Sequence, residues 1–268
     1  MKSLEEILLP LFAANRKFYG TACQIVVCGS IVPDPLQTLE TVASPSAPAP
    51  AACIRRRIKS MKRSLSILVA AIMAGNLLAQ SVDLPAPQKS GGMPLMDALA
   101  KRSTARAFDS KALSPQQLSS LLWAAFGINR PDGKRTAPSA RDFQETDIYV
   151  LMKQGAYVYS ARSNKLDLVV AEDIRALGGT QAFVKDAPAT LVFVADLSKM
   201  GNGSNEDKKN TANIDVGYIS QNVYLFCASE GLVTGARGMV DRTALGPRLK
   251  LRPDQMIILA QSVGYPKP

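Results

Sequence analysis

The sequence contains no histidine in its 268 residues. A catalytic triad of serine, histidine and aspartate needs an imidazole, as do a cysteine–histidine pair, a histidine general base and many zinc sites. This single absence therefore argues against the common classes of hydrolase and against an imidazole-ligated metal centre.

Cysteine is also scarce, and three of the four cysteines lie within the first 60 residues. Only Cys227 falls in the part of the chain that we expect to fold, inside an apolar run with helical spacing. One thiol cannot form an internal disulfide, so the hydrophobic core must stabilise the fold. We predict that Cys227 is a buried, small apolar side chain.

Acidic residues are outnumbered, but the excess positive charge is not concentrated in one place. The formal charge is +10, and residues 1–79 hold 9 Lys and Arg against 4 Asp and Glu, while residues 80–268 hold 23 against 18. A nucleic-acid-binding protein usually gathers its charge on one element with interleaved aromatic residues, and the sequence has no such helix. We therefore expect no nucleic-acid partner.

The stretch "MKRSLSILVAAIMAGNLLA", residues 61–79, has the three-part layout of a secretory signal peptide. It starts at Met61 with a basic pair, and its apolar run is too short to span a bilayer comfortably. We expect cleavage after Ala79, export to the periplasm or the medium, and no membrane association afterwards. A cytoplasmic location follows only if this interpretation is wrong.

The other N-terminal residues do not have the pattern of a folded domain. Residues 41–52 are low-complexity Pro/Ala sequence. Because a signal peptide begins at its own initiator methionine, we interpret residues 1–60 as an upstream misreading of the start site, with a disordered leader as the alternative. Residues 80–92 are predicted to be a Pro/Gly-rich linker, and residues 93–268 one domain with a single core.

Helical signals come first in this domain. A short helix near residues 95–99 ends at a basic stretch. The next helix is better defined, because Ser114 is an N-cap, Pro115 occupies the first helical position and Gln117 completes a capping box. Gly127 and the following "NRPDG" turn end it.

Strand signals follow, with one long helix between the last two strands. That helix, 214–232, is apolar nearly all round, which argues for burial on several sides, including by a second subunit. The polar residues 198–212 before it are predicted to be a loop. The order of elements indicates one α+β domain. The predicted strands are 146–153, a hairpin pair within 157–170, 189–197 and 255–265.

A cluster of basic residues and hydroxyls, "AKRSTARAF", occupies residues 100–108. It has two interpretations of equal weight when it is taken alone. In the first, the basic residues are the solvent-exposed C-terminus of a helix, where the helix dipole favours cations. Alternatively, Arg102 and Arg106 project to one side of a helical turn, where two guanidinium groups with a hydroxyl between them suit a phosphate.

The loop "RTAPSARDFQ", residues 135–144, is the second candidate for ligand binding. Pro138 and the small residues Ser139 and Ala140 stand just before a predicted strand. They let a flat ligand approach the backbone and offer hydroxyl and amide hydrogen bonds. The alternative is an ordinary polar turn.

Other glycine-rich and acidic stretches carry no recognisable site. "GNGSNE", "GARG" and "PDGKRT" fit neither the dinucleotide fingerprint nor the P-loop, so no nucleotide-binding fold is supported. Glu206 and Asp207 are followed at once by Lys208 and Lys209, which favours a solvated loop over a calcium site. We expect no metal.

Five stretches in the same order and spacing resemble the nitroreductase family of FMN-dependent oxidoreductases. They are "LAKRSTARAF", "LLWAAFGINRPDGKRTAPSA", "IYVLMKQGAYVY", "DVGYISQNVYLFCASEGLVTG" and the terminal "VGYP", and together they cover about residues 93–266. Each motif alone is weak. They are most similar to the branch that includes the azoline dehydrogenases of thiazole-forming peptide biosynthesis.

The resemblance implies a central, mostly antiparallel sheet flanked by helices, in an intertwined homodimer with one FMN in each of two interface sites. The helix 214–232 would be the central dimer helix. No side chain is expected to be catalytic, since NADH or NADPH would pass hydride to FMN N5 and a small electron-poor acceptor, such as a nitroaromatic or a quinone, would take the electrons. In the dehydrogenase variant, electrons would run from substrate to FMN.

The resemblance also implies which residues contact the cofactor. One group grips the phosphate and ribityl chain, a second lines the isoalloxazine ring across the interface, and a third presents backbone N–H groups near N5 and O4. A basic residue at the C-terminus helps to bind the phosphate. In that order, the residues are Arg102, Ser103 and Arg106; Pro138, Ser139 and Ala140, with Gln144 ending the same loop; Ala236, Arg237 and Gly238; and Lys267.

Two departures from the family pattern bear on function. Arg141 and Asp142 place polar bulk where the branch usually has a small residue, and only Lys267 stands where many members add several basic residues. These departures keep two rivals open: a protein that holds flavin or another phosphorylated ligand without turnover, and a structural dimer with a decayed site.

Overall fold

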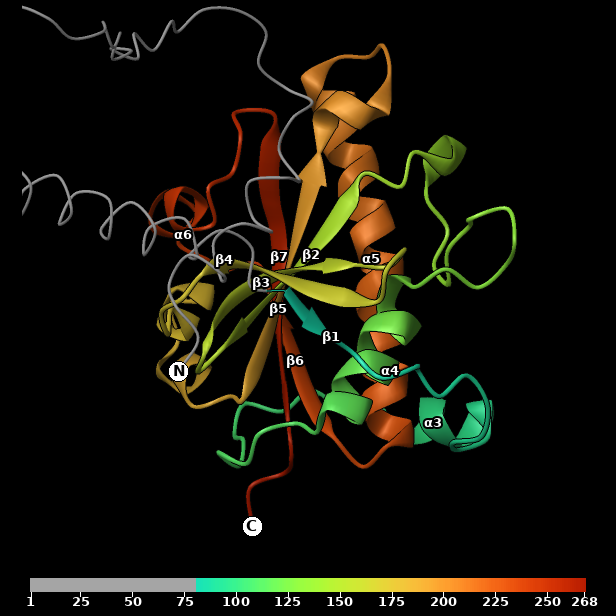
Figure 1. Cartoon of the computed structure of the whole chain (residues 1–268), viewed down its shortest axis with the longest axis vertical. Helices are drawn as coiled ribbons and strands as arrows, with labels where there is room; N and C mark the ends of the chain where they lie inside the picture. The colour runs from blue at the N-terminus through green and yellow to red at the C-terminus, as the bar shows by residue number, and fades with distance from the viewer. Residues whose placement is uncertain (1–80) are drawn as a thin grey trace, which may run out of the picture. The chain divides into compact units, whose positions relative to one another are not determined.

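The computed structural model describes residues 81–268, and Figure 1 shows their arrangement. The predictions for the leader, 1–60, and the signal peptide, 61–79, lie outside the described residues. In the described range, no helix combines the length and the apolar character that crossing a membrane requires.

One antiparallel sheet forms the centre of the described part, with its seven strands in the order β1-β4-β3-β2-β5-β7-β6. Every residue of β5, near the middle, is buried, which explains its continuous apolar sequence. The strands are β1 Ser81–Asp83, β2 Thr146–Met152, β3 Gly155–Ser160, β4 Lys165–Val170, β5 Ala189–Asp196, β6 Val233–Arg237 and β7 Gln255–Gly264.

Helices cover both faces of this sheet. Helices α4 and α5 pack into a large apolar cluster on one face, and α6 packs into a second cluster on the other, as Figure 1 shows. The helices are α3 Leu95–Lys101, α4 Pro115–Phe126, α5 Asn205–Ser229 and α6 Arg242–Arg248. Single 3₁₀ turns are η1 Ala140–Asp142, η2 Arg175–Gly178, η3 Ala182–Lys185 and η4 Leu197–Met200.

Several local predictions are confirmed. Ser114 Oγ accepts the N–H of Gln117 at 3.1 Å, and the Gln117 side chain accepts the N–H of Ser114 at 3.2 Å, so the capping box at α4 is complete. The β3–β4 hairpin turns through Asn164 at φ +51°, a conformation that asparagine tolerates. Cys227 is buried, and burial raises the pKa of its thiol, so it is a core side chain.

Helix α5 begins at Asn205, so the loop predicted for 198–212 was wrong for most of its length. Ser204 caps the helix by accepting the N–H of Asp207 at 3.1 Å. Glu206 and Asp207 lie in the first turn, where the helix dipole favours acidic groups. These turns are mostly exposed and carry no apolar stripe, which is why hydrophobic periodicity missed them.

Strand β6 was not predicted either. Its sequence, "VTGAR", is short, and the strand-favouring Val233 and Thr234 are followed at once by Gly235, which lowers the strand preference. Pairing with β7 along its whole length forms the strand.

Residues 81–92, predicted as a linker, follow the surface of the domain. Strand β1 pairs with β4 at the sheet edge. Ser119 Oγ of α4 donates to the Pro85 carbonyl at 2.5 Å, and Ser229 Oγ of α5 accepts the N–H of Met93 at 2.7 Å. At Gly92, with φ +83°, a Cβ would stand 2.6 Å from Ser229 Oγ. The stretch is therefore integrated into the fold by hydrogen bonds that its composition does not reveal.

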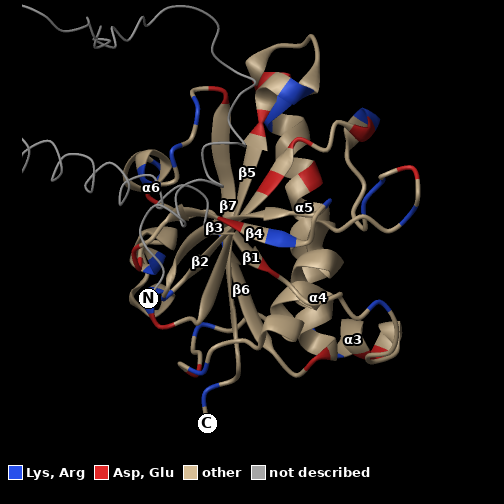
Figure 2. Ribbon diagram, in the orientation of Figure 1, with Lys and Arg blue, Asp and Glu red and all other residues tan. Residues whose placement is uncertain are grey.

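The charged side chains are spread over many elements of the described part. Figure 2 shows Lys and Arg interspersed with Asp and Glu on helices, strands and loops, without a basic stripe along any one of the described elements. This distribution matches the sequence, in which the excess positive charge is not concentrated in one segment.

We expect Ser114→Ala to lower the free energy of unfolding by about 1 kcal/mol, because the N-cap hydrogen bond at α4 is lost. For a domain of this size, the unfolding midpoint would fall by about 2–4 °C, which differential scanning calorimetry measures. Ser110→Ala is the control, since Ser110 is exposed and its side chain makes no hydrogen bond within residues 81–268. Equal midpoints for the two variants would contradict the capping role.

Candidate functional site

The basic stretch after α3 lies directly against strand β6. The N–H of Ala105 donates to the Thr234 carbonyl at 2.9 Å. Gly235 permits this approach, because a Cβ there would stand 2.5 Å from the Ala105 carbonyl oxygen. The fold thus brings the predicted phosphate group, around Arg102 and Arg106, beside the predicted N5 group, although about 130 residues separate them in sequence.

Tyr224 of α5 joins these two groups. Its hydroxyl lies 3.0 Å from Thr104 Oγ1 and accepts the backbone N–H of Ala236 at 3.0 Å. The Arg102 guanidinium lies over its ring, 5.4 Å from the centroid. We call Arg102, Thr104, Tyr224 and Ala236 the Tyr224 cluster.

Sequence reasoning missed two members of this cluster. Thr104 lies in the basic stretch of residues 100–108, but the prediction assigned a cofactor contact only to its neighbour Ser103. Ser103 is exposed. Tyr224 lies in an apolar helical run that was interpreted as core and dimer surface. The apolar residues around Tyr224 predicted only that it would be buried, and nothing in its spacing indicated a polar partner. In the structure it is half-buried on α5.

The Arg237 side chain points away from the Tyr224 cluster. Its guanidinium donates to the Gly178 carbonyl at 3.0 Å, the Gly235 carbonyl at 3.2 Å and Ser262 Oγ at 2.9 Å. Burial lowers its pKa to about 10, and it has no acidic partner within residues 81–268. This side chain joins β6, β7 and the η2 turn. Only the outward-facing backbone of neighbouring Ala236 enters the cluster.

Gly238, the last residue of the predicted N5 group, follows directly after β6. Its carbonyl accepts hydrogen bonds from the Arg242 guanidinium at 3.1 Å and from the N–H of Val240 at 3.0 Å. A Cβ on Gly238 would meet nothing within 4 Å. The space beside this backbone is therefore open.

The predicted ring-binding loop forms a second, separate group. The N–H of Ala140 donates to Asp215 Oδ2 of α5 at 2.9 Å, and Ser139 Oγ accepts the N–H of Gln144 at 3.0 Å. Gln144 Oε1 in turn accepts Arg135 Nε at 2.7 Å. Pro138 and Ser139 face a cleft of about 220 Å³.

This loop holds an unusual backbone. Arg141, Asp142 and Gln144 have φ values of +51°, +57° and +47°, in the left-handed region that costs side-chain-bearing residues free energy. The hydrogen bonds that the Ala140 and Gln144 N–H groups donate to Asp215 and Ser139 fix this conformation. Arg141 and Asp142, the residues that depart from the family pattern, are exposed at its tip.

Helix α5 separates the two groups. Asp215 binds the loop and Tyr224 organises the cluster, and the nine positions from one to the other correspond to about 13 Å along a helix axis. Within one chain, therefore, the fold brings the first and third predicted groups together but not the second.

Lys267 lies near the C-terminus, which runs beside the stretch that follows Arg106. Phe108 and Pro266 form a β-bridge. Lys267 lines a cavity of about 580 Å³ together with Lys153, Lys185 and Arg175, the last of which pairs with Asp173 at 2.7 Å.

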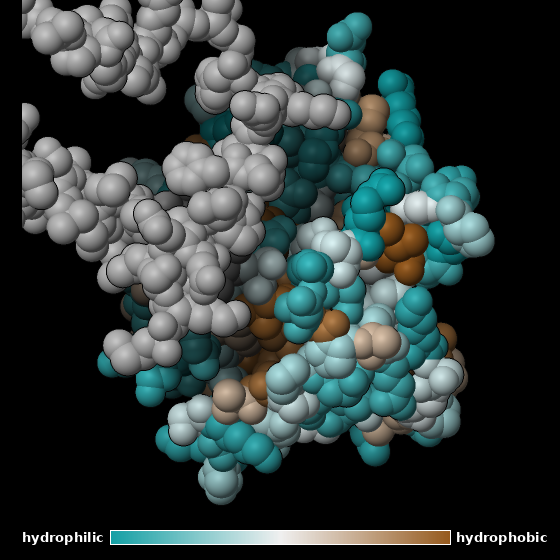
Figure 3. Space-filling view, in the orientation of Figure 1, coloured by the Kyte–Doolittle hydropathy of each residue, from teal (hydrophilic) through white to brown (hydrophobic). Residues whose placement is uncertain are grey.

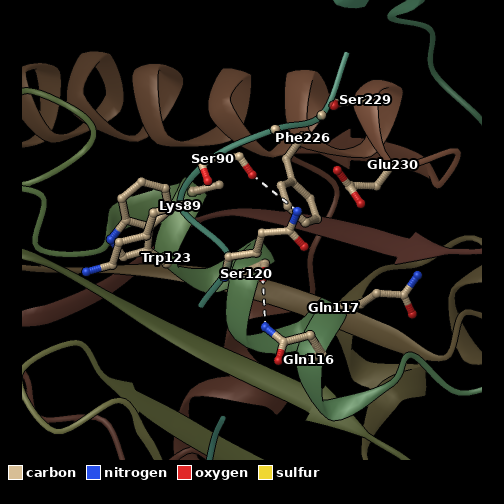
Figure 4. A pocket seen from close by; sticks show the side chains of 13 residues that line it. Lys89, Ser90, Gln116, Gln117, Ser120, Trp123, Phe226, Ser229 and Glu230 are labelled. Atoms are coloured by element: carbon tan, nitrogen blue, oxygen red, sulfur yellow. Dashed lines mark hydrogen bonds between the residues drawn. The ribbon is translucent and has the colours of Figure 1, made fainter. Parts of the chain in front are cut away.

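A smaller cavity lies elsewhere, between α4, the end of α5 and residues 88–92. Figure 4 shows its wall, with the Trp123 and Phe226 rings beside polar groups such as Gln116 and Ser229. Its volume of about 180 Å³ is below that of ordinary ligand pockets, and no predicted site residue lines it.

Apolar side chains are exposed on α3 and α5. On α5, Ile214 is 60% and Tyr218 48% exposed, one turn apart on the face opposite the core. On α3, Leu95, Met96 and Leu99 are exposed as well. Figure 3 shows apolar patches, in brown, interrupting a mostly hydrophilic surface. The prediction that α5 is apolar on several sides therefore holds for its central turns.

Comparison with known proteins gives consistent matches. A family model described as the nitroreductase family matches residues 99–265. A solved structure from Ralstonia eutropha JMP134, described as a nitroreductase, is 38% identical with a TM-score of 0.68, covering 70% of this chain and 90% of that one. A curated protein of Methanocaldococcus jannaschii, also named for the nitroreductases, is 27% identical over 175 residues, 62% of this chain and 88% of its own.

One more distant structure shows the same fold. It comes from Staphylococcus epidermidis ATCC 12228 and is described as an NAD(P)H:FMN oxidoreductase. It is 16% identical, has a TM-score of 0.51, and covers 68% of this chain and 92% of that one.

We expect Gly235→Ala to lower the free energy of unfolding by about 1–3 kcal/mol, because a methyl group would push the Ala105 backbone away from β6. Urea denaturation measures this change. Gly203→Ala is the control, since a Cβ there makes only an ordinary contact with the Lys208 side chain, and its effect should stay within about 0.5 kcal/mol. A Gly235→Ala protein as stable as the control would show that the two segments do not pack this closely.

Proposed function

The chain belongs to the nitroreductase family and is an oxidoreductase, and on this premise we propose that it binds FMN and uses NADH or NADPH to reduce an electron-poor acceptor, such as a nitroaromatic or a quinone. FMN, when bound, supplies hydride acceptance and donation at N5. The observation that carries the proposal is the convergence of Arg102, Thr104 and Ala236 on Tyr224.

The Tyr224 cluster has the donor set that one end of FMN requires. Arg102 is half-buried and Arg106 exposed, so two guanidinium groups are available for a phosphate. The hydroxyls of Thr104 and Tyr224 suit a ribityl chain, and the backbone N–H of Ala236, which donates to Tyr224, fixes the orientation of that hydroxyl. A solved structure of the same fold is described as an NAD(P)H:FMN oxidoreductase, which is consistent with this chemistry.

The residues of this chain bind and orient in this proposal, and none has to transfer a proton. A reaction that needs no proton transfer by a side chain suits a chain without histidine. The exposed Arg141 and Asp142 at the tip of the ring-binding loop would restrict which acceptors approach. We also propose that the chain belongs to the azoline dehydrogenase-like branch. Members of this branch would differ in substrate through side chains at this loop tip.

A homodimer completes the proposed site. The ring-binding loop is anchored about 13 Å along α5 from the Tyr224 cluster, so a loop from a second copy is the simplest source of the missing wall. The exposed apolar residues of α5, Ile214 and Tyr218, are the surface that such a copy would bury. We keep export through the signal peptide as a further proposal, which the intact mass of the secreted protein tests.

We expect the double variant Arg102→Ala, Arg106→Ala to bind FMN at least about 100-fold more weakly, since each charge-assisted hydrogen bond contributes about 1.5–3 kcal/mol. Quenching of flavin fluorescence measures the Kd, and bleaching of the flavin absorbance by NADH or NADPH measures turnover. Arg162→Ala is the matched control, because Arg162 is exposed on the β3–β4 turn. A wild-type protein that cannot be reconstituted with FMN would refute the proposed function, and unchanged affinity in the double variant would refute the phosphate assignment.

We expect Ile214→Asp to dissociate the dimer, because a charge would replace an apolar side chain at the centre of the proposed interface. Sedimentation velocity would show a monomer, and the flavin would be released with it. Val82→Asp makes the same kind of change at an apolar residue that is 43% exposed on the sheet edge, and it should leave the dimer intact. A dimer that survives Ile214→Asp with flavin bound would place the interface elsewhere.

A further inference from the structure

Glu145 is a buried acid that the proposed function does not use. It lies between the ring-binding loop and β2, and none of its surface is exposed. Its Oε1 accepts the Thr146 hydroxyl at 3.4 Å, while its Oε2 is buried with no hydrogen-bond partner in the described part of the chain. A carboxylate in this position would carry a buried and unsatisfied charge, which the protonated acid avoids.

Asp215 of α5 is the acid beside it. It is 3% exposed, and its Oδ2 accepts the N–H of Ala140 at 2.9 Å. The pKa of Glu145 is raised, first by burial and then by the neighbouring Asp215, through its charge and as a hydrogen-bond acceptor for the protonated acid. Two carboxyl groups this close cannot both be ionised at low cost.

The charged groups on the neighbouring segments do not neutralise this pair. The Asp196 carboxylate, at the end of β5, is bound by Arg252 at 2.7 Å and by Ser198. The Arg135 guanidinium donates hydrogen bonds to Gln144 Oε1 and to the Phe126 carbonyl. Among residues 81–268, no cation forms a salt bridge with either acid.

We propose that Glu145 is held protonated and donates its proton to Asp215, and that this shared proton fixes Asp215 on the Ala140 N–H and so holds the ring-binding loop in shape. Glu145 is thereby a positioning residue. Asp215 accepts the backbone N–H of Ala140, and Glu145 supplies a donor to the same buried carboxyl group. The loop's three left-handed residues depend on this anchor, because their conformation is costly without it.

The pair gives the loop a pH dependence of definite sign. The unfolded chain releases the Glu145 proton near its ordinary pKa of 4.5, whereas the folded protein retains it to higher pH. In the window above 4.5 the folded state therefore binds more protons, and its stability falls as pH rises until the folded-state pKa is passed. Above that pH Glu145 carries a buried charge without a hydrogen-bond partner for Oε2 and no longer donates to Asp215, and the loop loosens.

The first test compares the wild type with Glu145→Gln, which keeps a neutral donor but cannot ionise. In the window above pH 4.5, the unfolding midpoint of the wild type should fall relative to the variant by about 3–5 °C per pH unit. Glu230→Gln, the same change at an exposed position, should follow the wild type. Parallel curves for the wild type and Glu145→Gln, or a Glu145→Gln protein that does not fold, would overturn the proposal.

The second test uses Asp215→Asn, which removes the like charge and keeps a carbonyl acceptor for Ala140. Because burial still raises the pKa of Glu145, this variant should show a smaller pH-dependent fall than the wild type, and retention of the full fall would overturn the proposal. Hydrogen exchange of residues 138–144 adds a direct readout. The protection factor of the Ala140 amide should decrease with pH in the wild type and stay constant in Glu145→Gln, and equal profiles would contradict the shared proton.

The consequence for the ring-binding loop rests on the proposed function, and FMN titration tests it separately. In the wild type the Kd for FMN should rise above the same pH at which Ala140 loses protection, and in Glu145→Gln it should not. If neither protein binds FMN, the proposed function fails while the stability and exchange tests still decide the shared proton. If both bind FMN with the same pH profile, the loop does not control the flavin and that consequence is overturned.

Discussion

Packing of one face of α5 against the sheet is the constraint on which the candidate site depends. Its buried apolar residues recur at the spacing of one helix face. Because this face is fixed, the polar residues on the flanks of the helix are fixed as well. Asp215 then holds the ring-binding loop and Tyr224 holds the Tyr224 cluster. The buried apolar residues are Ala212, Val216, Ile219, Val223 and Cys227.

Buried polar pairs make this packing specific. Ser220 Oγ of α5 donates to Gln261 Oε1 of β7 at 2.8 Å, and both residues are buried. A rotation of the helix would break this bond and leave two polar groups without partners, which costs more than the bond itself contributes. The same argument applies to Arg237, whose three hydrogen bonds position the backbone of β6 so that Ala236 faces Tyr224.

The candidate site combines a rigid part, the Tyr224 cluster, with a strained part, the ring-binding loop. The Tyr224 cluster is built on a long helix and a strand, so its donors are held in place without backbone strain. The ring-binding loop has left-handed residues instead, which hydrogen bonds to Asp215 and Ser139 hold in place. A loop of this kind is suited to adjusting access, whereas the cluster is suited to holding a cofactor.

Local signals in the sequence determined the elements whose causes are local. The capping box of α4, the hairpin at Asn164, the apolar strand β5 and the buried Cys227 each follow from residues a few positions apart, and the ordered motifs of residues 93–266 indicated the family.

Only the tertiary structure decided the features that depend on distant partners. Strand β6 exists because β7 pairs with it, residues 81–92 are ordered against α4 and α5, and Thr104 meets Tyr224 across 120 residues. Glu145 shows no pattern in sequence, because the rise in its pKa depends on burial and on its distance from Asp215. Folding alone creates both quantities.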